Sequence, residues 1–296
     1  MASFGWRLES DMKKSAVDWA EPFFGQASDA ERLAQLQQEI LSLLENALAL
    51  AQSKHRDDKE SVHALRVLLK HLRAYWQLVR FAVPRLTFQA AKKRMRLTGK
   101  QLSAMRDREV LMDTLLDLVE SAPESEKACL MEVLKAWMTE PPPEPIPWDK
   151  VIHALKKERQ AWRKLKFDFQ SDTALQDGLA MTFTRCRALG KQAFQPDNLE
   201  QRHAWRKWVK YGYYQLKILR QLGLRGQRKR IQCLDELGDL LGREHDFMIL
   251  ESRLKETLSQ SELWSEHWTA IQAVYEAKMA DFQEQSAVLQ RRLSKL

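Results

Sequence analysis

Residues 63–70 read His-Ala-Leu-Arg-Val-Leu-Leu-Lys, and residues 203–210 read His-Ala-Trp-Arg-Lys-Trp-Val-Lys. Both segments fit the pattern H-x-x-R-x-x-x-K, and they lie 140 residues apart. A second pair of positions keeps nearly the same offset, because Asp107 and Asp246 each stand just ahead of a short apolar run. Two matched clusters at almost one offset indicate an internal duplication of the chain.

The repeated pattern gathers positive side chains on one face of a helix. At about 100° per residue, the basic residues of each segment fall within an arc about 100° wide. At a rise of about 1.5 Å per residue, the first such ridge is about 25 Å long. Leu65, Leu69, Leu72 and Trp76 recur on another face, which is the pattern of a helix that packs by its apolar side. The first ridge consists of His63, Arg66, Lys70, Arg73 and Arg80, and the second of His203, Arg206, Lys210, Lys217 and Arg220.

Positive charge is concentrated around both segments. The whole chain of 296 residues has a formal net charge of +8. Residues 61–110 hold twelve Lys or Arg against two acids, and residues 185–230 hold thirteen against two. Two separated segments of this kind predict a positive field that attracts an anionic partner.

The composition favours an all-α protein. Only 10 Gly and 9 Pro are present, too few for the many turns of an all-β fold, and no alternating β-branched segment predicts a strand. Residues 28–31, Ser-Asp-Ala-Glu, form a capping-box pattern at the start of the first helix. The expected helices span about 28–52, 59–83, 86–119, a segment ending at 138, 148–169, 173–194, 199–222, 225–258 and 262–293.

A proline-rich segment divides the chain. Residues 140–147 read Glu-Pro-Pro-Pro-Glu-Pro-Ile-Pro, a sequence that cannot be helical and that predicts an extended spacer. We therefore expect an N-terminal leader over 1–27, a first helical bundle over 28–139, a linker over 140–148 and a second bundle over 149–296.

The sequence also predicts a cytoplasmic protein. No apolar run approaches the roughly 20 residues of a membrane span, and the charged N-terminal segment lacks the apolar core of a signal peptide. Three widely spaced cysteines form no CxxC motif, so neither a disulfide framework nor a zinc site is expected.

At these residues the sequence resembles the conserved-histidine α-helical domain, the CHAD family, over about residues 28–290. In the first half the resemblance rests on the ridge from His63 to Arg73, followed by Arg106, Asp107 and Val110. In the second half it rests on His203, Arg206 and Lys210, followed by Leu241, Gly242 and Asp246, while residues 178–187 are similar to the basic stretch that opens the family's second half.

The resemblance implies two four-helix bundles related by pseudo-twofold symmetry, packed as one unit around a basic groove that binds inorganic polyphosphate. It also implies an association with polyphosphate granules, and phosphate or sulfate ions are expected to bind as small analogues. Two departures from the family pattern weaken the second ridge: Tyr213 stands where an Arg equivalent to Arg73 is expected, and Phe183 where Tyr is usual.

The expected ligand-facing residues come from the matched motifs and from the basic residues beside them. The motifs supply His63, Arg66, Lys70, Arg73, His203, Arg206 and Lys210, together with Arg185 and Arg187. The ridges and neighbouring basic segments add Arg80, Arg96, Lys100, Arg106, Lys207, Lys217 and Arg220.

The same sequence also bears on other classes of function, namely catalysis, metal binding and other acidic partners. The sequence has no G-x-S-x-G, H-E-x-x-H, P-loop or G-x-G-x-x-G motif, so no enzyme activity and no cofactor are expected. No two histidines stand three or four residues apart, so no metal site is expected either. Two alternatives stay open: a basic helical protein with ten tryptophans can bind RNA by phosphate contacts and stacking, or can serve as a scaffold on acidic partners.

Overall fold

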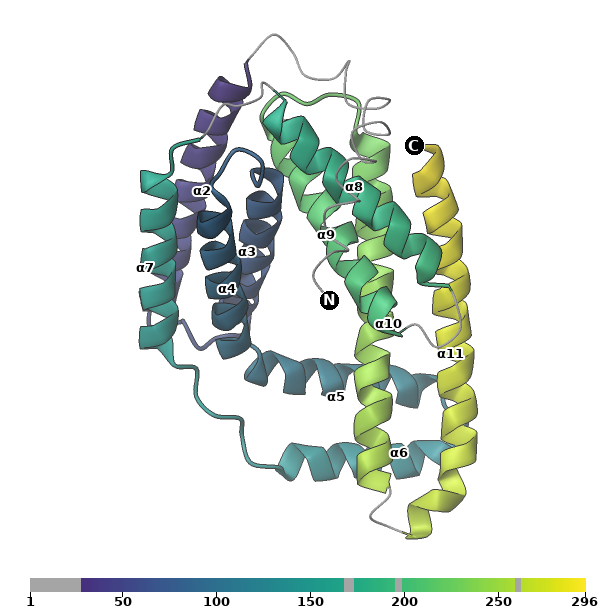
Figure 1. Cartoon of the computed structure of the whole chain (residues 1–296). Helices are drawn as coiled ribbons and strands as arrows, with labels where there is room; N and C mark the ends of the chain where they lie inside the picture. The colour runs from purple at the N-terminus through teal and green to yellow at the C-terminus, as the bar shows by residue number, and fades with distance from the viewer. Residues whose placement is uncertain (1–27, 168–172, 195–198, 259–261) are drawn as a thin grey trace. The chain divides into compact units, whose positions relative to one another are not determined.

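A computed structural model describes residues 28–167, 173–194, 199–258 and 262–296, and every regular element in these ranges is a helix (Figure 1). The all-α prediction is therefore confirmed; the expected leader over 1–27 lies outside the described residues. The helices are α2 (Asp29–Gln52), α3 (Lys59–Leu78), α4 (Arg85–Gln101), α5 (Ala104–Ser121), α6 (Glu124–Thr139), α7 (Trp148–Lys164), α8 (Ala174–Gln192), α9 (Leu199–Gln221), α10 (Arg228–Leu258) and α11 (Glu262–Lys295).

The first described helix begins as the sequence predicts. The Glu31 amide donates to Ser28 Oγ at 3.2 Å, and the Ser28 amide donates to Glu31 Oε2 at 2.8 Å. These reciprocal bonds satisfy two backbone donors that the first turn of a helix otherwise leaves without partners. The capping box is confirmed.

The expected helix over 86–119 is instead two helices. α4 ends at Gln101 and α5 begins at Ala104, with Leu102 and Ser103 between them. Leu102 is buried, and its carbonyl oxygen accepts a hydrogen bond of 2.8 Å from Arg66 Nη1 on α3. The break is held by a side chain that is distant in sequence, so helical periodicity alone could not predict it.

Residues 141–147 contain no helix, as the proline-rich spacer predicts. Apart from the expected helix over 86–119, each of the other eight has one counterpart whose predicted ends lie within five residues of the observed ones. The largest differences are at the C-terminal ends of α7 and of α3, which stops at Leu78, shortly before Pro84.

The helices group into two compact units. Unit 1 comprises residues 28–102 and 146–235 with Leu296, and so contains α2, α3, α4, α7, α8, α9 and the start of α10. Within it, α2 packs against α7 and α3, while α3 also packs against α4, α8 and α9 (Figure 1). The helices that carry the two H-x-x-R-x-x-x-K segments, α3 and α9, are thus direct neighbours.

A buried carboxylate joins three helices of unit 1. Glu158 on α7 is fully buried, and its oxygens accept hydrogen bonds from Trp76 on α3 and from Trp162 at 3.0 Å. Arg94 on α4 donates to the same carboxylate at 2.6 Å and 2.5 Å. A buried carboxylate needs partners of this kind, and here they fix α3 and α4 against α7.

Unit 2 comprises residues 103–145 and 236–295, which include α5, α6, α11 and most of α10. Its core contains residues from all four helices, among them Leu118, Val133, Phe247 and Ile271.

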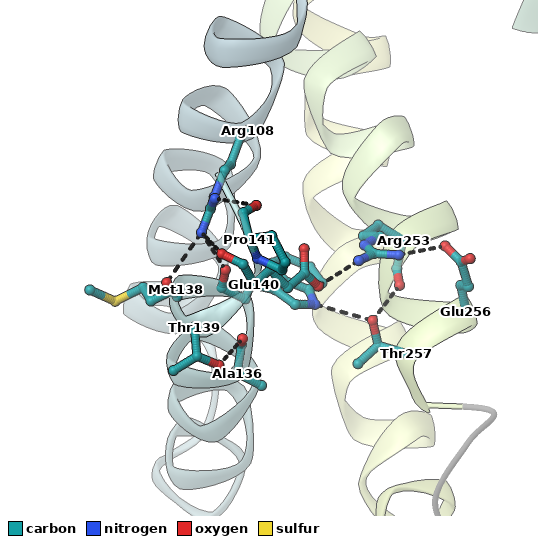
Figure 2. A network of polar contacts seen from close by, with 10 residues as sticks. Arg108, Ala136, Met138, Thr139, Glu140, Pro141, Arg253, Glu256 and Thr257 are labelled. Atoms are coloured by element: carbon teal, nitrogen blue, oxygen red, sulfur yellow. Dashed lines mark hydrogen bonds and ion pairs between the residues drawn. The ribbon is translucent and has the colours of Figure 1, made fainter. Parts of the chain in front are cut away.

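A polar network closes the end of α6 in unit 2 (Figure 2). Arg108 on α5 donates to the carbonyl oxygens of Trp137, Met138, Glu140 and Pro141 at 2.9–3.2 Å. Trp137 and Met138 belong to the last turn of α6, where backbone N–H donors are few, and a cation at the negative end of a helix dipole is favourable. Arg108 therefore has a structural role, although it contributes to the first basic window of the sequence.

Arg253 on α10 fixes the same end of α6 from another helix (Figure 2). Its guanidinium donates to Glu140 Oε1 at 2.6 Å and to Glu256 Oε2 at 2.9 Å, and these carboxylates raise its pKa above the ordinary value. Trp137 Nε1 also donates to Thr257 Oγ1 at 3.2 Å.

The two units do not coincide with the two expected bundles, because each unit contains segments from both sides of the proline-rich spacer. The division into bundles at 28–139 and 149–296 rests on the sequence repeat, and it stays a prediction, as does the pseudo-twofold relation.

No helix among the described residues has the length and apolarity needed to cross a membrane. Cys129, Cys186 and Cys233 are buried and form no disulfide.

Candidate anion-binding site

Three helices of unit 1, α3, α4 and α9, enclose a cavity of about 270 Å³. Its lining residues are of two kinds, cationic residues and mostly aromatic or apolar residues. The cationic residues are Lys70, Arg73, Lys92, Arg96, Arg206, Lys207 and Lys210, joined by His203. The remaining residues are Trp76, Gln77, Phe88, Met95, Tyr211 and Tyr214.

Helical spacing explains why these residues share one cavity. Lys70, Arg73 and Gln77 follow one another along one face of α3 at intervals of three and four. Similar intervals separate Phe88, Lys92 and Met95 on α4, and His203, Arg206 and Lys210 on α9. Residues three or four apart project from the same side of a helix, so each helix presents one stripe to the cavity.

The cavity holds a concentration of positive charge. Seven of its lining residues are Lys or Arg, and none is Asp or Glu. Among the described residues, no carboxylate forms an ion pair with Arg73, Lys92, Arg96, Arg206 or Lys207, whereas Lys210 Nζ lies 3.6 Å from Asp235 Oδ1. Five of the seven cations are therefore not compensated by an ion pair with any described carboxylate.

Loss of hydration, together with neighbouring positive charges in two cases, lowers the pKa of three of these groups. The pKa of Lys207 is lowered mainly by partial loss of hydration, and to a smaller extent by the positive charges of Lys92 and Arg73. Desolvation lowers the pKa of Arg73 as well, and desolvation together with Arg206 and Lys207 lowers the pKa of His203. A bound anion would act in the opposite direction, because a nearby negative charge stabilises the charged form of each group.

Three buried polar atoms at the cavity have no hydrogen-bond partner among the described residues. They are Nε of Arg73, Nε of Arg206 and Oε1 of Gln77. Buried polar atoms in folded proteins are nearly always hydrogen-bonded, so these three are exceptions, although each has less than 1 Å² of accessible surface and is not reached from the cavity as it stands.

Arg73 is positioned by α4. Its Nη2 donates to the Met95 carbonyl oxygen at 2.8 Å, and the same nitrogen lies against Gly99, where a Cβ atom would collide with it. Gly99 therefore leaves the space that the guanidinium occupies beside the cavity.

An aromatic cluster borders the cavity near Tyr214. The His71 ring lies 4.1 Å from the Tyr214 ring, centroid to centroid, and burial together with Lys217 and Lys70 lowers the His71 pKa to about 4. Tyr213 stands where the family pattern expects Arg, and its ring centroid lies 5.3 Å from Lys210 Nζ and 5.2 Å from Lys217 Nζ. Cation–π contact lets this aromatic residue sit between two ammonium groups.

The structure brings seven of the sixteen expected site residues to the cavity: Lys70, Arg73, Arg96, His203, Arg206, Lys207 and Lys210. The others do not line it. His63 and Lys100 are exposed, Arg66 is bonded to the Leu102 carbonyl, and the side chain of Arg106 lies outside the described residues.

The remaining expected residues lie on other parts of α3, α8 and α9. Arg80 donates to Met181 Sδ at 2.8 Å and lies over the Phe88 ring, 5.5 Å from its centroid. Arg185, Arg187 and Lys217 are exposed. Arg220 lines a separate basic hollow at the turn between α9 and α10, together with Arg225, Arg228 and Lys229. Whether these residues contact a ligand stays a prediction.

Sequence reasoning did not select Lys92 or the aromatic lining. The spacing of Phe88, Lys92, Met95 and Arg96 could have indicated that α4 contributes to the site, because these four residues share one helical face. What that face meets depends on the packing of α4 beside α3 and α9, which a local pattern does not contain. No group of three or more His, Cys, Asp or Glu that could hold a metal ion occurs within the described part of the chain.

Comparison with known proteins identifies the architecture. The chain matches the family model for the CHAD domain over residues 34–255. It is also similar to the crystal structure of the CHAD domain from the plant Ricinus communis, with 19% sequence identity over 90% of both chains and a TM-score of 0.50, a likeness that concerns the fold. No curated protein matches the sequence. With three quarters of its length covered by the family model, and with the repeated histidine helices packed as neighbours, the chain belongs to the CHAD domain family.

Proposed function

We propose that this protein binds inorganic polyphosphate at the cavity between α3, α4 and α9. The observation that carries the proposal is the lining of seven Lys and Arg residues without a single Asp or Glu. A linear phosphate polymer bears about one negative charge per phosphate, so it can compensate several of these cations at once.

The kinds of donor in the cavity suit phosphate oxygens. Arg73 and Arg206 offer planar guanidinium groups at the cavity. Lys92 and Lys207 add mobile ammonium groups on α4 and α9, which can follow a flexible chain. Association with polyphosphate granules in the cytoplasm is part of this proposal, as a consequence of the binding.

RNA is the main alternative anion. Proteins that bind single-stranded RNA without sequence preference stack bases on accessible aromatic residues. Trp76, the tryptophan that lines the cavity, is 1% exposed and cannot serve as a stacking platform, which favours a polymer that consists of phosphate alone. A scaffold role on acidic protein surfaces would use the exposed cations at the cavity, such as Lys92 and Lys207. Arg73 and Arg206 are half-buried, which favours a narrow ligand such as a phosphate chain.

The test is a competition experiment with the full chain. Long-chain polyphosphate carrying a fluorophore is bound first, and unlabelled polyphosphate or single-stranded RNA of equal phosphate content is then added. We expect polyphosphate to displace the probe at least ten-fold more effectively, and the affinity to fall as salt rises because bound counterions are released. Equal or better displacement by RNA would contradict the proposal, as would binding that is insensitive to salt.

A further inference from the structure

A second group of cations surrounds the hollow at the turn between α9 and α10. This turn hollow has a volume of about 750 Å³ and is lined by residues 220 and 223–229. Its lining contains no Asp or Glu, and four of its eight residues are cations: Arg220, Arg225, Arg228 and Lys229. All four are exposed, and none forms an ion pair with a carboxylate of the described residues. Four uncompensated positive charges around one hollow favour the binding of a polyanion.

The backbone of the turn holds these cations in place. The Leu224 amide donates to the Leu219 carbonyl oxygen at 2.9 Å, and the Gly223 amide donates to the Arg220 carbonyl oxygen at 3.2 Å. This pair of bonds is the Schellman arrangement at the end of a helix, and it places Gly223 in the left-handed region with a φ of 99°. Leu224 is buried and so anchors the turn in unit 1. The cations are therefore carried by a fixed turn.

Helix α9 connects the turn hollow with the cavity. Lys210 lines the cavity, Arg220 lines the turn hollow, and the exposed Lys217 lies between them on the same continuous helix. At about 100° per residue, these three side chains fall within an arc of about 80°. At a rise of about 1.5 Å per residue, Lys210 and Arg220 are separated by about 15 Å along the axis. A row of cations therefore leads along one face of α9 from the cavity to the turn hollow.

The row keeps a net positive charge. Asp235 Oδ1 lies 3.6 Å from Lys210 Nζ, so this one cation is partly compensated. Lys217 contacts Tyr213 instead, with 3.4 Å between its Nζ and the Tyr213 hydroxyl oxygen, and it forms no ion pair with a described carboxylate. Lys217 and Arg220 thus offer two charges to an anion that extends beyond the cavity.

We propose that the turn hollow is a second anion-binding site of unit 1, which a long polyphosphate chain occupies together with the cavity, while Lys217 contacts the phosphates between them. The identity of the polymer rests on the proposed function, whereas the second site rests on the cations of the turn. Binding at two linked sites raises the affinity, because the second contact is intramolecular once the first has formed. A chain too short to reach both sites gains nothing from the second.

The test compares long-chain polyphosphate with inorganic tripolyphosphate, whose three phosphates are too short to span the two sites. Arg225→Glu with Arg228→Glu changes the turn hollow. We expect this hollow variant to fold, because both side chains are exposed and an acid in the first turn of α10 is favourable. Lys156→Glu with Lys157→Glu, on the exposed face of α7, is the matched control and reverses the same amount of charge in unit 1.

The measured quantity is the ratio of the long-chain affinity to the tripolyphosphate affinity, from titration calorimetry with the full chain at one fixed salt concentration. We expect this ratio to fall at least ten-fold in the hollow variant, because the linked second contact is lost. In the α7 control it should change less than about two-fold, because a change in net charge acts on both ligands. An unchanged ratio in the hollow variant, or an equal fall in the control, would overturn the inference.

A cavity variant separates this inference from the proposed function. If Arg206→Glu with Lys207→Glu weakens the binding of both ligands while the hollow variant leaves the ratio unchanged, the proposed function stands and the second site is wrong. If the cavity variant binds both ligands as well as the unmodified chain does, the proposed function is contradicted, and occupancy of both sites by one chain is contradicted with it.

A neutralising variant keeps the test valid if the charge reversal unfolds the protein. Arg220→Gln with Lys229→Gln removes two cations of the turn hollow without adding an acid. The same ratio should fall several-fold, because the polymer loses part of its second contact. Lys156→Gln with Lys157→Gln is the matched control. Equal ratios in these two variants would overturn the inference.

Discussion

At the scale of single residues, the arginines of the basic segments have different roles. Arg73 faces the cavity while one of its nitrogens is held by the Met95 carbonyl, and Arg206 has a buried Nε without a protein partner. Arg66, from the same motif, instead bonds the carbonyl of Leu102 where α4 ends. A position in the motif therefore predicts a basic residue on a helix, but it does not predict whether that residue contacts a ligand or stabilises the fold.

Gly99 gives a test of how Arg73 is positioned. We expect Gly99→Ala to displace the Arg73 guanidinium, because the new methyl group occupies its place against α4. Polyphosphate affinity should fall about ten-fold, since a charge-assisted hydrogen bond contributes about 1.5–3 kcal/mol. Thermal stability should be retained or rise, because Ala is favoured over Gly in a helix by about 1 kcal/mol. Calorimetric titration and thermal unfolding check both statements, and unchanged affinity would show that Arg73 does not contact the ligand.

At the scale of helices, most of the fold could be predicted from the sequence. The capping box at Ser28, the apolar stripe of α3 and the proline-rich spacer are local features, and local features determine where helices exist. The break after Gln101 could not be predicted because a side chain from α3 holds it. The contribution of α4 to the site was missed for a similar reason, since Lys92 reaches the cavity only through the packing of α4 against α3.

The buried carboxylate of Glu158 tests how these helices are held together. We expect Glu158→Gln to lower the free energy of unfolding by about 3 kcal/mol, because Arg94 is left largely buried without its counter-ion. The replacement amide also fits poorly between the Arg94 guanidinium and the indole donors of Trp76 and Trp162. Denaturant unfolding followed by circular dichroism measures this change.

A matched control is available on α2. Glu45 pairs with Arg163 at 4.0 Å, and both side chains are well exposed to solvent. Glu45→Gln should therefore cost less than about 1 kcal/mol, as exposed ion pairs contribute little. Equal losses in the two variants would contradict the role given to Glu158.

At the scale of the whole molecule, the two basic windows of the sequence divide into structural and cavity-lining parts. Arg94 and Arg108 satisfy a buried carboxylate and a helix end, whereas seven other cations of the windows surround one cavity. The proximity of the two repeated segments was implied by the resemblance, and α3 and α9 are indeed packed together. The sequence does not place Trp76 and Tyr214 at the cavity, because their spacing is equally typical of core residues, and both are buried.

The central claim is that polyphosphate binds at this cavity and not over the basic surface in general. Two double variants separate these possibilities, since each reverses two positive charges in unit 1. Arg206→Glu with Lys207→Glu changes the cavity, and Lys156→Glu with Lys157→Glu changes the exposed face of α7. Circular dichroism first confirms that both proteins remain folded.

The measurement is the affinity of each double variant for long-chain polyphosphate at one fixed salt concentration. We predict a loss of about a hundred-fold or more for the cavity variant, since two charge-assisted contacts of about 1.5 kcal/mol each disappear and two repulsions replace them. The α7 variant should lose only a few-fold through the change in net charge. Equal losses in the two variants would contradict the account, because they would show that the polymer senses the overall charge and not this site.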